Sequence, residues 1–173
     1  GWRVARLYRT DPDLPSETGP LLVPTVAMQE GDVVEAINGV ATLSLPDPGA
    51  LLRDKTGKQI LLKVKDGKTR KSREVIVKPL SPSGAGDLRY SDWERSRRLA
   101  VEEKGKGEIG YLHLRAMTTS EYTTWAREFY PVFNPQGLII DVRHNGGGNI
   151  ESWLLSKLLR KAWFWWQPRV GDP

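Results

Sequence analysis

Cysteine is absent from this sequence of 173 residues, so disulfides and thiolate chemistry are excluded within it. No apolar run approaches the roughly 18 residues that a membrane-spanning helix requires, and the longest aromatic cluster, Trp163 to Trp166, is far too short. Histidine occurs only twice, as His113 and His144, and no spacing of histidine, aspartate and glutamate suggests a metal site. We therefore expect no metal, no cofactor and no membrane partner.

A concentrated stripe of positive charge is also lacking. The net charge is +5 and the isoelectric point is near 9.5, a balance that can indicate nucleic acid or membrane headgroups as partners. However, the basic residues are spread along the chain, and the densest block, from Lys63 to Lys78, is interrupted by Asp66 and Glu74. We expect a solvated surface and no nucleic-acid partner; nucleic-acid binding is the rival, and it predicts an affinity that falls steeply with salt.

The first part of the chain, residues 1–80, is rich in short strand patterns and turn residues. Asn38-Gly39 is a strong tight-turn dipeptide, and Asp47 followed by Pro48 suits the start of a short helix. Two strands near its end form a hairpin with a turn at Asp66-Gly67. The predicted elements are strands over Trp2 to Tyr8, Val33 to Ile37, Ile60 to Lys65 and Glu74 to Lys78, and a helix ending at Leu52.

The remainder of the chain alternates helix and strand. Ser81 to Gly86 is the best linker candidate, and the capping-box pair Ser91 and Glu94 begins a helix that ends at Gly105. After it we expect a strand over Ile109 to Leu114, a helix capped by Thr118 and ended by Pro131, a strand from Leu138 to Asp141, and a helix from Ile150 to Lys161. This order is typical of a right-handed parallel βαβ unit.

The predicted fold class is therefore α+β. A small β-rich domain (residues 1–80) precedes a linker and connecting helix (81–106) and an incomplete α/β core (107–173).

The most informative segment is the loop between the strand ending at Asp141 and the helix beginning near Ile150. It contains three consecutive glycines, Gly146 to Gly148, which allow positive φ values and close approach of a bound group. The following helix directs its unpaired amides to the same place, which suits a phosphate or the oxyanion of a tetrahedral intermediate. The phosphate interpretation lacks a Walker-type lysine. A purely structural tight turn is the other alternative.

Four segments in order resemble the C-terminal-processing serine peptidases, particularly their tricorn-type branch. The likeness covers most of the chain, and the order of the segments is more specific than any one motif. The matching segments are Glu30-Gly31-Asp32 with Ile37-Asn38-Gly39, which resembles a PDZ core; Arg89-Tyr90-Ser91-Asp92-Trp93 with Arg97-Arg98, a connecting helix; Gly107 to Met117, a first catalytic-core strand; and Gly137 to Gly148.

The resemblance implies a serine peptidase that hydrolyses peptides through an acyl-enzyme. It implies that a backbone amide of the glycine loop, Gly148 first and Gly147 second, contributes to the oxyanion hole. Asp141, Arg143 and Asn145 are expected to support that loop. The nucleophile and the histidine base are expected beyond Pro173 and before Gly1, so this piece should be inactive alone. For the parent protein, the resemblance further implies a homo-oligomer in the cytoplasm.

Weaker candidates and a different class of function stay open. His113 lies within a predicted strand, where a core role is expected, whereas His144 flanks the glycine loop and could reach the mouth of the site. The aromatic stretch Trp163 to Trp166 suits packing between domains more than a substrate cleft. The PDZ-like part lacks a clear Gly-hydrophobic-Gly-hydrophobic loop, so a non-catalytic peptide-binding or scaffolding module is the alternative to an enzyme.

Overall fold

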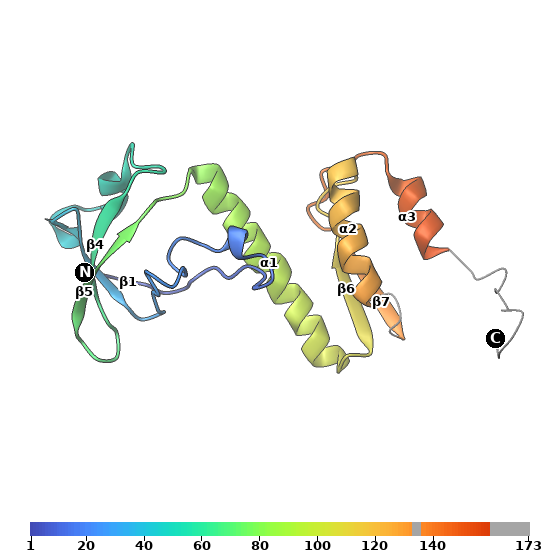
Figure 1. Cartoon of the computed structure of the whole chain (residues 1–173), viewed down its shortest axis with the longest axis horizontal. Coiled ribbons are helices and arrows are strands. Elements are labelled where there is room, and N and C mark those ends of the chain that lie inside the picture. Colours follow the sequence, from blue (N-terminus) through green and yellow to red (C-terminus); the bar gives the residue numbers. More distant parts are fainter. Residues whose placement is uncertain (133–135, 160–173) are drawn as a thin grey trace, which may run out of the picture. The chain divides into compact units, whose positions relative to one another are not determined.

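The computed structural model describes residues 1–132 and 136–159 (Figure 1). The chain divides into two compact units, Gly1–Arg97 and Arg98–Pro173, which are considered separately below. Among the described residues, no helix is long and apolar enough to cross a membrane. The aromatic stretch Trp163 to Trp166, for which packing between domains was predicted, lies outside the described residues, as does the end of the last predicted helix.

The first unit is the predicted β-rich part of the chain, and its strands form an antiparallel sheet. Its strands lie in the order β1-β2-β4-β5, and β3 pairs with β2. Asn38 and Gly39 connect β2 to β3 with φ values of 48° and 81°, the pair of positive values that a tight hairpin turn requires. The strands are β1 (Trp2–Arg3), β2 (Val33–Ile37), β3 (Val40–Ala41), β4 (Ile60–Lys65) and β5 (Ser72–Val77).

Three short 3₁₀ helices lie in the loops of this unit. They are η1 (Pro15–Glu17), η2 (Thr42–Ser44) and η3 (Pro48–Leu52). The predicted start of η3 is confirmed, because the Asp47 side chain accepts a hydrogen bond from the N–H of Gly49 at 2.8 Å.

The first strand is shorter than predicted, because the ladder ends at Arg3. Beyond it, Val4 still exchanges backbone hydrogen bonds with Gly31 and Asp32, but the next bonded N–H groups donate to side chains. The N–H of Leu7 donates to Glu30 Oε1 at 3.0 Å, and that of Arg9 donates to Asp92 Oδ1 at 2.8 Å. These acceptors lie far away in the sequence, so the alternation of residues over Trp2 to Tyr8 could not reveal them.

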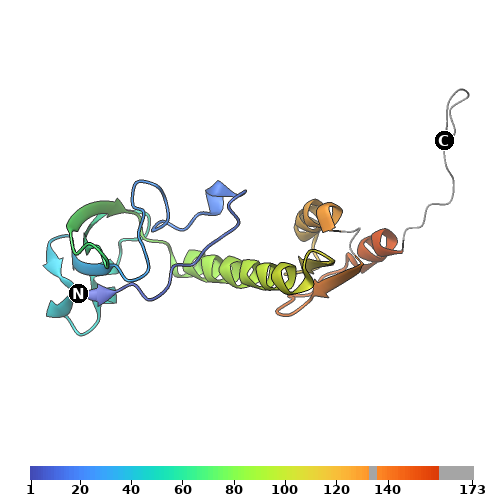
Figure 2. The same cartoon turned by 90° about the horizontal axis from the view of Figure 1, so that it is seen from below.

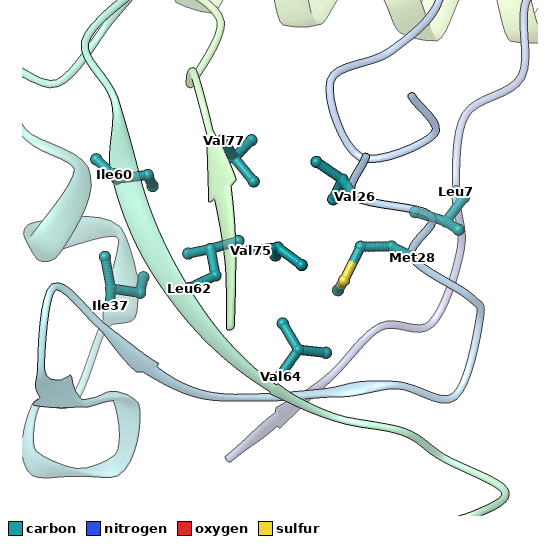
Figure 3. Packing of buried hydrophobic residues seen from close by; sticks show 9 residues of the cluster. All are labelled: Leu7, Val26, Met28, Ile37, Ile60, Leu62, Val64, Val75 and Val77. Carbon is teal, nitrogen blue, oxygen red and sulfur yellow. The ribbon is translucent and has the colours of Figure 1, made fainter. Parts of the chain in front are cut away.

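The core of the first unit lies on one face of the sheet (Figure 3). Ile60, Leu62 and Val64 alternate with exposed residues along β4, and Val64 is fully buried. This period of two is what places one apolar face of a strand against a core. The nine buried residues are Leu7, Val26, Met28, Ile37, Ile60, Leu62, Val64, Val75 and Val77.

The helix α1 (Pro82–Gly105) begins about nine residues earlier than the Ser91–Glu94 pattern predicted. Ser81 to Gly86, expected as a linker, is instead its cap and first turns. Ser81 Oγ accepts a hydrogen bond from the N–H of Gly84 at 3.0 Å, and Pro82 occupies the first helical position. This cap contributes about 1 kcal/mol and so offsets part of the cost of Gly84 and Gly86, which is about 1 kcal/mol each.

The second unit is the predicted strand–helix–strand–helix segment. It comprises β6 (Ile109–His113), α2 (Thr119–Val132), β7 (Gly137–Asp141) and α3 (Glu151–Leu158). The two strands are parallel, from Ile109 opposite Gly137 to His113 opposite Asp141. Figures 1 and 2 show α2 lying along one face of this two-stranded sheet. Trp125 and Phe129 of α2 pack there with Leu112 and with Leu154 of α3.

Candidate functional site

The two parallel strands of the second unit end side by side, and Asp141 closes this edge. Its carboxylate accepts a hydrogen bond from the buried Tyr111 hydroxyl at 2.8 Å. The backbone N–H of Arg143 donates to it at 3.0 Å, and the Arg143 guanidinium forms an ion pair with it. That guanidinium holds the pKa of the Asp141 carboxyl well below its usual range, although burial of Asp141 acts in the opposite direction. Asp141 therefore stays ionised and fixes the first residues of the loop.

The two histidines take different positions. His113 is buried, and its Nδ1 lies 2.8 Å from the carbonyl oxygen of Asp141, so its ring is held in the interior. His144 is exposed and has a φ of 60°, in the turn that follows Arg143. The structure thus brings His113 to the strand end and leaves His144 on the surface beside the glycines.

Asn145 connects the glycine loop to the end of the other strand. Its Nδ2 donates to the carbonyl of Leu114 at 2.8 Å, and its Oδ1 accepts from the N–H of Gly147 at 2.7 Å. Its own backbone N–H donates to the carbonyl of Val142 at 3.2 Å. Asn145 therefore spans two segments that are about thirty residues apart in the sequence, and it occupies the Gly147 amide.

The glycines run alongside residues 115–117 in a short parallel ladder. The N–H of Gly146 donates to the carbonyl of Arg115 at 2.9 Å. Met117 then makes two bonds, because its N–H donates to the carbonyl of Gly147 at 2.8 Å and its carbonyl accepts from the N–H of Asn149 at 2.9 Å.

This ladder determines where the amide of Gly148 points. In a trans peptide the C=O and the N–H point in opposite directions, and the chain contains no cis peptide among its described residues. Since the C=O of Gly147 points at Met117, the N–H of Gly148 points away from Met117. Within residues 1–132 and 136–159, no acceptor is hydrogen-bonded to this N–H, and Gly148 is exposed.

Only glycine fits at position 148. A Cβ built there would lie 1.9 Å from the carbonyl oxygen of Met117, and the φ of Gly148 is +139°. Gly147 differs, because its φ of +84° is also unfavourable for a side chain but a Cβ would meet nothing within 4 Å. The two neighbouring amides therefore differ in their partners: the Gly147 N–H donates to the Asn145 side chain, whereas the Gly148 N–H points outward.

Comparisons with known proteins match both parts of the chain. Residues 1–82 match the family model described as the tricorn protease PDZ domain, and residues 108–171 match peptidase family S41. The chain carries a tricorn-type PDZ domain and an S41 peptidase segment. The predicted family and the predicted fold class are thereby confirmed.

Individual tricorn proteins align with nearly the whole chain. Tricorn protease homolog 1 of Streptomyces coelicolor is 33% identical over 172 residues, which cover 99% of this chain and 16% of that protein. The tricorn protease of Thermoplasma acidophilum is 30% identical, over 97% of this chain and 15% of that protein. A crystal structure of the tricorn protease superposes with a TM-score of 0.78 at 28% identity, and covers 97% of this chain and 16% of the other. The chain thus spans about a sixth of the length of these relatives.

The tricorn-type PDZ domain has a feature that the sequence did not predict. An apolar cavity of about 400 Å³ opens beside its core. Its walls include Leu7, Met28, Ile60 and Leu62, together with Ala85 and Leu88 from the first turns of α1. Because Ala85 was assigned to a linker in the sequence, no helix was expected to wall a cavity here.

Two residues of the S41 segment were missed by sequence reasoning. Tyr111 bonds the Asp141 carboxylate, and Met117 binds both sides of Gly148 through its backbone. The bond from Tyr111 could have been foreseen, because a tyrosine inside a buried strand needs a hydrogen-bond partner for its hydroxyl. The second left no signal, because a backbone contact does not depend on the side chain. No group of three or more potential metal ligands gathers in the described part of the chain.

Proposed function

We propose that the protein from which this chain comes is a serine peptidase, and that the N–H of Gly148 is one donor of its oxyanion hole. The observation that carries the proposal is this outward, exposed amide at the carboxyl end of a parallel strand. A donor fixed there before the reaction can receive the charge that develops on a carbonyl oxygen without reorganising. Membership of the S41 segment in a peptidase family supports the same chemistry.

The proposed reaction is acyl transfer to a serine, supplied by the protein outside this chain. The serine oxygen bonds to the substrate carbonyl carbon, and the C=O π electrons move onto the oxygen, which becomes the oxyanion near Gly148. When that electron pair returns, the C–N bond breaks and the amine leaves with a proton. Water then attacks the acyl carbon, the bond from that carbon to the serine oxygen breaks, and the carboxylic acid leaves while the serine oxygen regains a proton.

The residues behind the amide are proposed to support it and not to touch substrate. Asp141 is held by Tyr111 and Arg143, and Asn145 ties the loop to Leu114. These contacts fix the backbone on both sides of the glycines. Because the N–H of Gly147 is bonded to Asn145, we propose Gly148 as the principal donor; Gly147, the secondary candidate, would first have to release Asn145.

Replacing single amides by esters in the natural full-length protein tests the proposal, because an ester removes an N–H without adding a side chain. An ester at the 147–148 bond removes the Gly148 N–H, and kcat for peptide hydrolysis should fall about 100- to 1000-fold. An ester at the 146–147 bond removes the Gly147 N–H as the matched control and should cost much less. Equal losses, or no loss with the first ester, would count against Gly148 as the donor.

The chain of residues 1–173 alone is proposed to be catalytically inert. A fluorophosphonate probe that labels active-site serines should label the natural protein and leave this chain unlabelled. Clear labelling of the chain would place a nucleophile within it and contradict the proposal. We also propose a homo-oligomeric assembly in the cytoplasm for the natural protein, on the family resemblance; sedimentation as a monomer would contradict the first part.

The apolar cavity favours a second candidate function, a peptide-binding module without catalysis. A peptide library with free carboxyl termini is the probe, and Ala85→Trp is the variant that fills the cavity from α1. If the cavity binds peptide, Ala85→Trp should abolish binding, whereas Gly86→Trp, at an exposed neighbouring position, should keep it. Binding that survives Ala85→Trp would exclude the cavity as the site.

A further inference from the structure

The C=O of Gly148 faces the same open side as its N–H. The N–H of Asn149 donates to Met117, so the carbonyl of the same trans peptide, which belongs to Gly148, points away from Met117. Within the described residues no donor is hydrogen-bonded to this carbonyl. Gly148 therefore presents a donor and an acceptor on the same side, and the residue is exposed.

A donor and an acceptor on one residue are the pattern that an antiparallel strand recognises. In such a pair, two facing residues exchange both of their backbone hydrogen bonds, with their Cα atoms about 5.5 Å apart. Peptides bind many proteins by adding a strand in this way, and their main-chain bonds supply the affinity. The other residue of this local ladder, Met117, cannot serve, because both of its backbone groups are already bound to the loop.

We propose that the carbonyl of Gly148 is a second docking point for substrate, which accepts the N–H of the residue whose carbonyl is attacked. This inference rests on the proposed function, because that residue, here called the acyl-side residue, is the one whose carbonyl lies at the Gly148 N–H. The substrate class follows: an extended peptide whose acyl-side residue has a secondary amide. Proline, an N-alkylated residue or an ester at that position cannot donate to Gly148.

At this position the site would therefore recognise the backbone N–H of the substrate residue and not its side chain. A substrate lacking the N–H leaves the Gly148 carbonyl without a donor in the bound complex, and an unsatisfied acceptor is costly when water is excluded. The loss should be felt in binding of both the ground state and the transition state, because the bond does not change as the carbonyl becomes tetrahedral. KM should therefore rise more than kcat falls.

The experiment uses the natural full-length protein and denatured casein as the probe substrate. A cleaved casein peptide is located by mass spectrometry and synthesised in three forms: unchanged, with an ester oxygen replacing the N–H of the acyl-side residue, and with the same replacement one residue upstream. The first ester should lower kcat/KM by about tenfold or more, mainly through KM. The upstream ester is the matched control and should change kcat/KM by about threefold at most.

The outcomes separate this inference from the proposed function. If casein is cleaved and the acyl-side ester is processed as well as the unchanged peptide, the Gly148 carbonyl is not a docking point, although the peptidase assignment stands. The same conclusion follows if both esters lose equally. If casein is not cleaved and a fluorophosphonate probe does not label the protein, the proposed function fails and the inference fails with it.

Discussion

At the residue scale, the three glycines of the loop differ in what requires them. Gly148 lacks space for a side chain and has a positive φ, whereas Gly147 has only the positive φ. Gly146 has neither restriction to the same degree, because its nearest neighbours lie at 3.9 Å or beyond and its φ is not positive. The run of identical letters therefore contains three different positions.

A graded series of alanine substitutions measures these requirements. Gly148→Ala should destabilise the fold by about 3 kcal/mol or more, since the Cβ collides with the Met117 carbonyl. Gly147→Ala should cost about 1 kcal/mol, through backbone strain alone. Gly137→Ala is the control in the adjacent strand, with open space and no positive φ, and it should be nearly neutral. Denaturant unfolding gives the order, and a Gly148→Ala cost no larger than that of Gly147→Ala would contradict the close contact.

The depressed pKa of Asp141 predicts how stability changes with pH. A carboxyl with a lower pKa in the folded state binds protons less readily than in the unfolded state, whose pKa is about 3.9. Its stabilising contribution is fully present above about pH 5 and is lost as the pH falls toward the folded-state pKa. The free energy of unfolding of the unaltered chain should therefore exceed that of Asp141→Asn by a constant amount at neutral pH, and the difference should shrink below about pH 4. A difference independent of pH from 7 to 3 would contradict the ion pair.

From the sequence, the candidate site could be assigned to a segment but not to a particular atom. Three glycines after a buried strand were sufficient to predict an amide-rich loop at a strand end. Which amide points outward depends on Asn145 and Met117, and both contacts join residues about thirty positions apart. No local pattern encodes such a pairing, so the sequence could rank Gly148 above Gly147 only through family resemblance.

At the element scale, helices and strands with strong local signals were predicted well. β2, β4 and η3 have the expected bounds, since alternating apolar residues and the Asp47-Pro48 pair act within a few residues. The predicted start of α1 was wrong, because Gly84 and Gly86 resemble a linker until the Ser81 cap is considered together with Pro82. The predicted first strand was too long, because the N–H groups of Leu7 and Arg9 donate to the side chains of Glu30 and Asp92 and not to a neighbouring strand.

The early start of α1 makes Ser81 a helix cap, which is testable. Ser81→Ala removes the acceptor for the Gly84 N–H and should lower the stability of the first unit by about 1 kcal/mol. Ser81→Gly should cost only a few tenths of a kcal/mol, since glycine leaves that N–H open to water. Denaturant unfolding distinguishes the two. If residues 81–86 were a linker, the alanine variant would be as stable as the unaltered chain.

At the scale of the whole molecule, the basic residues are distributed along the chain, and several of them pair with acidic side chains. Arg6 bonds Asp92, Arg73 bonds the buried Asp32, and Arg98 bonds Glu128. Burial by itself raises the pKa of Asp32, but hydrogen bonds from Gln29, Gly67 and Arg73 lower it overall, so this pair stays charged. The net charge of +5 is the balance of 26 basic and 21 acidic residues that are interleaved along the sequence.

This distribution predicts weak, non-specific attraction to nucleic acid. A labelled DNA duplex should show some binding at about 0.02 M salt and essentially none at about 0.15 M, as expected when few phosphates are contacted. Fluorescence anisotropy at both salt concentrations measures it, with a random-sequence duplex as the control. Binding that persists at the higher salt, or that differs between sequences, would revive nucleic acid as a partner.

The pairing of Met117 with Gly148 also has a kinetic consequence. The two residues are separated in the sequence by α2 and β7, so we expect them to meet only after both elements have packed against β6. Closing this segment of about thirty residues costs chain entropy, which is compensated only when the contacts of the complete sheet have formed. The outward direction of the Gly148 amide is therefore set only late in folding, after β7 has paired with β6.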